Sequence, residues 1–405
     1  MSDVEPCASG ARAPDIAHRG DVPAEVPRGR DVSVAPEGAP GADGAFDRSG
    51  GWAAVLATLF RREELSPEQA TATFGEILAG RASPAQIGAF VAALRVKGET
   101  VAELTGFVAA MRRFGEGVSV GDGTIDTCGT GGDRSGTINV STLAALVATG
   151  AGATVLKHGG RAASSRAGSA DVLEALGVAV DLGAEGVELC LRTTHVGFCL
   201  ATRFHPAMRH AGPVRRELGV ATVFNVLGPL DNPGRVTRQV IGVGDPAMAE
   251  RMVGVLEATG AVHAIVCYGH DGLDELSTVT TSTAIELVAG ADGTRRRTVV
   301  VDPRALGIAP ADPAELRGGD AVENAARARA ILAGERGAQR DLVALNAAAA
   351  LVVSGIVEDL AGGLEAAYAS IDTGAAATAL DGLVAISGAA AEHERGAERP
   401  APAAT

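Results

Sequence analysis

Hydrophobic positions at the start of the folded region recur at a helical spacing. Trp52, Val55 and Leu59 lie three and four residues apart, which places them along one face of a helix. Three further helix starts follow, each with Ser or Thr three residues before Gln or Glu, which is the spacing of a capping box. They begin at Ser66, Ser83 and Thr100. Residues 51–120 are therefore predicted to form a small all-helical domain.

From residue 121 the pattern changes to short apolar runs, typical of buried strands, that alternate with amphipathic helices. The expected strands are residues 124–128, 153–156, 198–202, 239–244, 261–268 and 298–301. The expected helices include residues 170–176, 185–194 and 246–259, and a long helical region follows residue 321. This alternation predicts an α/β domain over residues 121–387, with a central, mostly parallel sheet flanked by helices.

Both ends of the chain lack this periodicity. Residues 1–50 and 388–405 are rich in Ala, Gly and Pro, so we expect a disordered extension and a disordered tail. The five cysteines are odd in number and include no C-x-x-C pair, and no apolar run is long enough to span a bilayer. The expectation is a reduced, cytoplasmic compartment and no membrane contact.

Composition narrows the classes of function. The formal charge is −14, from 35 Lys and Arg against 49 Asp and Glu, and aromatic residues make up 3% of the chain. An acidic chain with few aromatic residues argues against nucleic-acid binding, which relies on basic surface and on stacking. Local sites for small anions stay compatible with this charge.

Two glycine-rich loops follow expected strands. The first is Gly129-Thr130-Gly131-Gly132-Asp133, and glycine there lets backbone N–H groups crowd around an anion near a helix N-terminus. The second runs from Lys157 to Ser165 and continues to Ser169, with two cations and three hydroxyls. Both loops predict phosphate binding. The alternatives are a plain glycine-rich turn for the first loop and a helix N-cap role for Ser169.

Two further motifs carry charged groups that suit small anionic substrates. Asp274 and Glu275 are adjacent acids after an expected strand, and their hard carboxylate oxygens suit Mg²⁺, whereas the alternative is a solvated acid pair in a loop. Arg215 can hold a planar carboxylate through two parallel hydrogen bonds, and its alternative is a surface position on a helix.

Taken in order, these motifs resemble the anthranilate phosphoribosyltransferase family over residues 52–387. The resemblance rests on the two loops, on Asn139-Val140-Ser141-Thr142, on the block from His205 to Pro233 and on Asp274-Glu275. It implies a helical domain, completed by residues 205–233, joined to the α/β domain, and a homodimer. The implied reaction is a Mg²⁺-dependent pentosyl transfer from phosphoribosyl diphosphate to the amine of anthranilate, a step of tryptophan biosynthesis.

The resemblance also implies roles for individual residues. Phosphoribosyl diphosphate would be bound by Gly132, Asp133, Thr137, Asn139, Val140, Ser141, Thr142, Lys157, His158, Gly159, Gly160, Arg161, Ala162, Ala163, Ser164, Ser165 and Ser169. Anthranilate would be bound by Gly129, Gly160 and Arg215, and Mg²⁺ by Ser141, Asp274 and Glu275. No covalent or acid–base catalyst is expected, because positioning and electrostatics carry the reaction, with Arg215, Asp274 and Glu275 the most critical.

The chain departs from the family pattern at Gly160. The family's loop reads Lys-His-Gly-Asn-Arg, so a carboxamide that contacts the acceptor is missing here, and Thr202 stands where proline is common. One alternative is therefore a paralogue that uses another aminobenzoate or aromatic amine. A pyrimidine nucleoside phosphorylase-like enzyme and a non-catalytic relative that binds nucleic acid are the others.

Overall fold

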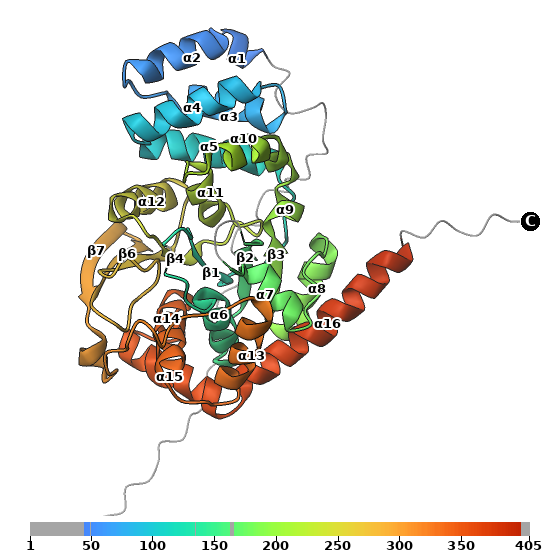
Figure 1. Cartoon of the computed structure of the whole chain (residues 1–405), viewed down its shortest axis with the longest axis vertical. Coiled ribbons are helices and arrows are strands. Elements are labelled where there is room, and N and C mark those ends of the chain that lie inside the picture. The colour runs from blue at the N-terminus through green and yellow to red at the C-terminus, as the bar shows by residue number, and fades with distance from the viewer. Residues whose placement is uncertain (1–43, 49, 134, 163–165, 398–405) are drawn as a thin grey trace, which may run out of the picture. The chain divides into compact units, whose positions relative to one another are not determined.

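The computed structural model describes residues 44–48, 50–133, 135–162 and 166–397. A bundle of short helices comes first along the chain, and a seven-stranded sheet with its helices follows (Figure 1). The bundle consists of α1 (Ala45–Arg48), α2 (Gly51–Phe60), α3 (Pro67–Leu78), α4 (Pro84–Lys97) and α5 (Val101–Phe114). The later helix α10 (Gly212–Leu218) packs against α4.

Reciprocal side-chain caps start three helices of the bundle. Ser66, Ser83 and Thr100 each accept a hydrogen bond from the backbone N–H three residues later, and that later residue's side chain accepts one from the cap's own N–H. Each such cap stabilises its helix by about 1 kcal/mol. The predicted helix starts at these three positions are confirmed.

The seven strands form one sheet in the order β3-β2-β1-β4-β5-β6-β7. The strands are β1 (Ile125–Gly129), β2 (Val155–Gly159), β3 (Val196–Leu200), β4 (Arg238–Gly242), β5 (His263–Gly269), β6 (Ser282–Gly290) and β7 (Gly293–Val301). The first five pair in parallel, and the last two pairings are antiparallel. The prediction of a mostly parallel sheet is confirmed.

The hairpin of β6 and β7 was not predicted from the sequence. Only residues 298–301 are an expected strand there, because the earlier residues of β7 are polar and exposed on an edge strand, without the alternation that a half-buried strand shows. The third expected strand, which runs to Thr202, is too long, because α9 (Ala201–Phe204) already begins at Ala201.

Neighbouring residues of the central strands face two different cores. Val240 and Ile265 join the core formed with the later helices, whereas Ile241 and Val266 join the core that includes the helical bundle, as the two-residue period of a strand requires. The first core contains α6 (Val140–Gly150), α7 (Ser169–Ala175), α8 (Ala184–Thr194), α13 (Ala321–Leu332), α14 (Ala338–Ser354), α15 (Leu360–Asp372) and α16 (Ala375–Ala397). The second contains α11 (Phe224–Leu230) and α12 (Pro246–Ala258), and two 3₁₀ segments lie at Pro206–His210 and Pro303–Leu306.

Both predicted disordered ends extend too far into the chain. Within residues 1–50, α1 is helical because Phe46 is buried and its ring packs edge-on against Trp52, at 5.6 Å between centroids. Within residues 388–405, α16 continues to Ala397, because Ala390 is buried and Glu394 accepts a 3.1 Å hydrogen bond from the backbone of Gly183. The predictions for residues 1–43 and 398–405 lie outside the described residues.

Among the residues that the structure describes, no single helix is both long and apolar enough to cross a membrane. Only α15 and α16 taken together pass on length and composition, and they are bent by 64° at their junction.

Candidate active site

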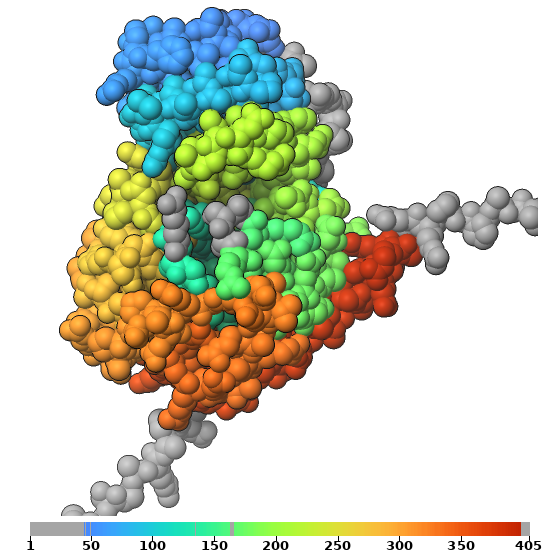
Figure 2. All heavy atoms as spheres, viewed as in Figure 1, coloured from blue at the N-terminus to red at the C-terminus, as the bar shows by residue number. Residues whose placement is uncertain are grey.

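The two glycine-rich loops and the acid pair lie at one edge of the sheet. Gly129 ends β1, Gly159 ends β2, and Asp274 with Glu275 follows β5. Because β1 to β5 are parallel, their carboxyl ends share one edge, where open α/β sheets bind ligands. Figure 2 shows the molecule hollowed between the yellow-green residues of α10 and the teal residues around β1 and α6.

A hydrogen bond connects the first glycine-rich loop to the acid pair. Gly131 and Gly132 have φ angles of 67° and 82°, a backbone region that favours glycine, and the N–H of Gly131 donates a 2.7 Å hydrogen bond to Oδ2 of Asp274. A Cβ atom at Gly129 would clash with the same carboxylate. Glycine is therefore required at Gly129 by the close approach of Asp274, as well as by the turn itself.

Lys157 connects the second loop to the start of α6. Its Nζ donates to the backbone oxygen of Thr127 at 2.6 Å and to Oγ of Ser141 at 3.2 Å, which leaves one N–H for a ligand. The side chain of Lys157 is buried, so this cation is held in place before any anion binds. Lys157, predicted to bind phosphoribosyl diphosphate, and Ser141, predicted to bind Mg²⁺, are thus neighbours.

The acid pair is electrostatically unfavourable as it stands. Burial raises the pKa of Asp274, and the nearby charges of Glu275 and Asp133 raise it further. Burial also raises the pKa of Glu275, to about 8, although Lys157 opposes that shift. Like charges buried together are relieved by a cation, so the donor set of Ser141, Asp274 and Glu275 fits a hard divalent ion.

The fit to Mg²⁺ depends on oxygen ligands beyond the protein. Among the described residues, no group of three or more His, Cys, Asp or Glu side chains gathers around one point. Mg²⁺ is commonly held by one or two carboxylates while substrate phosphates and water complete its coordination, and the two carboxylates here match that pattern.

His158 lies beneath the second loop as a neutral imidazole. Its Nδ1 donates to the backbone oxygen of Gly228 at 3.0 Å, so Nε2 carries a lone pair, and Nε2 has no partner among the described residues. Burial, together with the ring of His205 at 5.1 Å between centroids, lowers the pKa of His158 to about 3. His158 is among the residues predicted to bind phosphoribosyl diphosphate, but its contact with residue 228 was not foreseen.

A buried carboxylate supports this loop from below. Asp126 is fully buried and accepts hydrogen bonds from the N–H of His158 at 3.1 Å and from Nδ2 of Asn232 at 2.8 Å. Neither Asp126 nor Asn232 was predicted from the sequence. The signal that could have found them is a polar residue inside an otherwise apolar strand and an Asn-Pro-Gly turn, both of which are unusual in a core.

Arg161 does not face the sheet edge in this structure. Its guanidinium is paired with Glu174 of α7 at 2.7 Å and with Asp171 at 3.3 Å. Asp171 also accepts hydrogen bonds from the N–H of Ala162 at 2.9 Å and of Gly168 at 2.8 Å, so it fastens both sides of the loop. Three other residues that are predicted to bind phosphoribosyl diphosphate, Ala163, Ser164 and Ser165, lie outside the described residues.

The alternative role for Ser169 is wrong. Gly168 is the N-cap of α7 and Ser169 is its first residue, with Oγ donating to the backbone oxygen of Gly160 at 3.4 Å. The hydroxyl of Ser169 therefore lies at the second loop, which is predicted to bind phosphoribosyl diphosphate.

Several other residues that are predicted to bind phosphoribosyl diphosphate lie around the start of α6. Asn139 is its N-cap residue, but its amide donates to the backbone oxygen of Ala167 and its oxygen accepts from Asn324 of α13. Val140 and Thr142 are buried in the first turn, and Oγ1 of Thr142 has no partner among the described residues. Thr137 forms a bridge with Arg317. Asn324 and Arg317 were not foreseen, because they lie about 180 residues further along the chain.

Arg215 is separate from this cluster, on α10. Its guanidinium lies over the ring of Phe224 at 5.4 Å from the centroid, and no carboxylate partner is found among the described residues. Burial lowers the pKa of Arg215. A half-buried arginine on a helix without an acidic partner among the described residues is available to an anionic ligand, and its role in binding the acceptor stays a prediction.

Comparisons with known proteins follow the same division of the chain. A model described as the a/b domain of the glycosyl transferase family matches residues 121–377, and one described as its helical bundle domain matches residues 53–115. Anthranilate phosphoribosyltransferase from Roseiflexus castenholzii is 50% identical over 330 residues, which are 81% of this chain and 96% of that protein. The enzyme of the same name from Rhodococcus jostii is 48% identical over 335 residues, 81% of this chain and 91% of that protein.

The chain belongs to the anthranilate phosphoribosyltransferase family.

Solved structures of anthranilate phosphoribosyltransferases share this fold. The enzyme from Thermus thermophilus superposes with a TM-score of 0.77 at 39% identity, covering 82% of this chain and 99% of that chain. The enzyme from Saccharomyces cerevisiae, solved in complex with PRPP and Mg, has a TM-score of 0.76 at 25% identity, covering 84% and 98%. The membership makes this chain a glycosyltransferase of the pentosyl-transferring kind, as the sequence predicted.

Proposed function

We propose that this chain transfers the phosphoribosyl group of phosphoribosyl diphosphate to the amine of anthranilate, with release of pyrophosphate. The observation that carries the proposal is the buried acid pair of Asp274 and Glu275, tied to the N–H of Gly131 and facing the fixed cation of Lys157. Such an arrangement suits a diphosphate that is shared between a metal ion and backbone N–H groups.

The protein's part in the reaction is positioning and charge stabilisation. Lys157 and the N–H groups of the first loop would bind the diphosphate and stabilise the negative charge that develops as the bond from the ribose anomeric carbon to oxygen breaks. Mg²⁺, held by Ser141, Asp274 and Glu275, would supply Lewis-acid neutralisation of the same oxygens. An arylamine is uncharged at neutral pH, so its lone pair attacks without a general base, and its proton then leaves to solvent.

Arg215 would orient the acceptor. A guanidinium binds a planar carboxylate through two parallel hydrogen bonds, and the ring of Phe224 beneath it keeps the fork in one place. Fixing both substrates converts a bimolecular attack into an effectively unimolecular one, which is where most of the rate gain of such an enzyme arises.

One observation favours a second acceptor. A Cβ atom at Gly160 would meet only the Cβ of Ala201, at the ordinary contact distance of 3.8 Å, so the position has room that the family's asparagine would fill. A substituted aminobenzoate or another aromatic amine could use that room. This is the paralogue that the sequence left open.

The test is a pyrophosphate-release assay with purified protein, Mg²⁺, phosphoribosyl diphosphate and a panel of aminobenzoates. Anthranilate giving the highest kcat/KM supports the proposal, and a substituted aminobenzoate giving the highest value supports the second acceptor. If the folded protein released pyrophosphate with none of the aminobenzoates in the panel, both proposals would be contradicted.

A homodimer and a cytoplasmic location complete the proposal. The four described cysteines, Cys128, Cys190, Cys199 and Cys267, are all buried free thiols, which suits a reducing compartment. Exposed apolar side chains on the helical bundle, Phe60 on α2 and Val96 on α4, support self-association there. Sedimentation of the full chain measures the assembly.

A further inference from the structure

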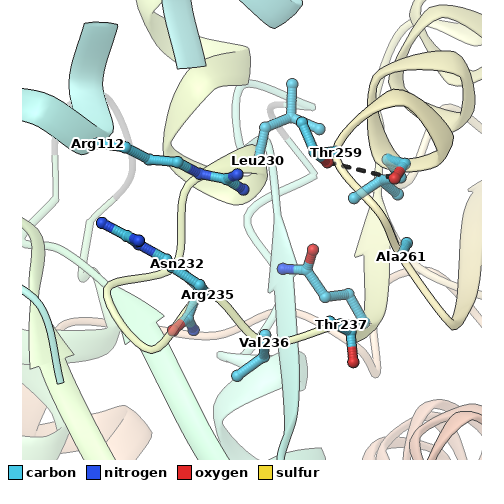
Figure 3. Close-up of a pocket in the computed structure, with 10 residues that line it drawn as sticks. Arg112, Leu230, Asn232, Arg235, Val236, Thr237, Thr259 and Ala261 are labelled. Carbon is cyan, nitrogen blue, oxygen red and sulfur yellow. Dashed lines mark hydrogen bonds between the residues drawn. The ribbon is translucent and has the colours of Figure 1, made fainter. Parts of the chain in front are cut away.

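A polar cavity lies at the opposite edge of the sheet from the glycine-rich loops. It has a volume of about 210 Å³ and is bounded by the first residues of β4, the end of α12 and Arg112 of α5 (Figure 3). Arg238, the first residue of β4, pairs with Ile125 and His263 at the amino ends of β1 and β5. The cavity is therefore separate from the residues at the carboxyl ends, where the diphosphate is proposed to bind.

Two arginines line this cavity, and each has side-chain N–H groups that lack an acceptor among the described residues. Nε of Arg112 donates to Oδ1 of Asp231 at 3.2 Å, and its two Nη groups have no acceptor among the described residues. The side chain of Arg235 has no hydrogen-bond or ion-pair partner among the described residues, and its charge acts to lower the pKa of Asp231. Figure 3 shows both arginines on one side of the cavity, with Thr259 and Ala261 on the other. Arg112 and Arg235 are the charged residues among the described ones that line the cavity, so its lining carries two positive charges in a chain whose net charge is −14.

The loop that carries Arg235 is held in place by a buried side chain. Arg235 has a φ of 48°, which is uncommon for a residue other than glycine, and its N–H donates to the backbone oxygen of Asn232 at 2.8 Å. Asn232 in turn donates to Asp126 and to the backbone of Leu156, both at 2.8 Å, and accepts from the N–H of Gly234. An unusual backbone conformation that its surroundings fix so firmly is typical of a binding loop.

We propose that this cavity binds a small oxyanion of the phosphate type through Arg112 and Arg235. A planar guanidinium with two free Nη groups can donate two parallel hydrogen bonds to such an ion, and the volume accommodates it with accompanying water. The exposed hydroxyl of Thr237 and the carboxamide of Gln239 also line the cavity. Because Arg112 comes from the helical bundle and Arg235 from the segment before β4, the bound ion contacts both parts of the fold.

Calorimetric titration of the full chain with inorganic phosphate, at constant ionic strength set with chloride, tests the proposal. Arg112→Gln and Arg235→Gln are each expected to raise the Kd for phosphate about tenfold or more, since each removes a charge-assisted contact. Arg113→Gln is the matched control, because Arg113 is an exposed neighbour on the same helix that does not line the cavity. Arg235→Gln also guards against misfolding, because this exposed side chain has no structural partner.

Lys157→Gln separates the two edges of the sheet. It weakens any phosphate bound at the carboxyl edge and leaves the cavity intact, so tight binding that survives Lys157→Gln and is lost in Arg235→Gln supports the cavity. Binding that Lys157→Gln abolishes, binding equal in wild type, Arg112→Gln and Arg235→Gln, or no heat above the chloride control would each overturn the proposal. Each of these outcomes removes the cavity site and leaves the result of the pyrophosphate-release assay unchanged, so the two proposals fail independently.

Discussion

The carboxylate of Asp274 accepts a 2.7 Å hydrogen bond from the backbone N–H of Gly131, 143 residues earlier in the chain. This bond fixes the first glycine-rich loop against the acid pair. It also holds Asp274 where burial and the neighbouring carboxylates raise its pKa.

Asp274→Asn is therefore expected to separate stability from activity. The carboxamide oxygen can still accept from Gly131, and loss of a buried like charge stabilises the metal-free protein by about 1 kcal/mol, or roughly 2–4 °C in Tm. The same change removes a proposed metal ligand, so the Mg²⁺ concentration for half-maximal activity rises at least tenfold. Asp292→Asn, in the exposed turn between β6 and β7, is the control. An unchanged Mg²⁺ requirement would remove Asp274 from the metal site.

Arg215→Ala tests the acceptor site. The loss of a charge-assisted bidentate contact of about 1.5–3 kcal/mol raises KM for the acceptor roughly 10- to 150-fold, with little change in KM for the donor. Arg216→Ala is a matched control, because Arg216 is the exposed neighbour on the same helix. Steady-state kinetics with each substrate varied in turn measure both values. Equal effects of the two substitutions would contradict the assignment.

Gly160→Asn tests whether the missing carboxamide limits use of anthranilate. The new Cβ has room beside Ala201, and one neutral hydrogen bond of about 0.5–1.5 kcal/mol lowers KM for anthranilate roughly 2- to 12-fold. Gly159→Ala is the contrasting variant, since its Cβ would clash with Oγ of Ser169 and lie 3.0 Å from the ring of Phe198. We expect that variant to lose stability. If Gly160→Asn raises KM for anthranilate and lowers it for no other acceptor, the site does not match the family's.

His158 makes folding stability depend on pH. Its folded pKa, about 3, lies below the unfolded value near 6.5, so below pH 6.5 the unfolded chain binds a proton that the folded chain does not. The contribution is nearly complete at pH 7.5 and falls by about 1.4 kcal/mol between pH 7.5 and 5.5. Urea unfolding at both pH values measures it. His158→Gln should lose that much less stability than the wild type, and His393→Gln, in the exposed part of α16, should behave like the wild type. Identical pH dependence in all three proteins would show that His158 is not the cause.

Local sequence was sufficient for the elements whose ends are defined by short-range chemistry. The caps at Ser66, Ser83 and Thr100 depend on side chains three residues apart, and the strands before the two glycine-rich loops are short apolar runs beside glycine. The order of the motifs also identified the family. The first residues of β7 were missed because an exposed edge strand lacks the alternation that burial imposes.

The site itself needed contacts between distant segments. The sequence shows that Asp274, Gly131 and Lys157 are the kinds of residue that bind a metal diphosphate, since side-chain chemistry and backbone freedom are local properties. Only the parallel sheet brings β1, β2 and β5 to one edge, and only packing decides that Asp126 and Asn232 lie beneath His158 and that Arg161 turns to α7. These arrangements depend on burial and on pairing across more than a hundred residues in some cases, and no local pattern records them.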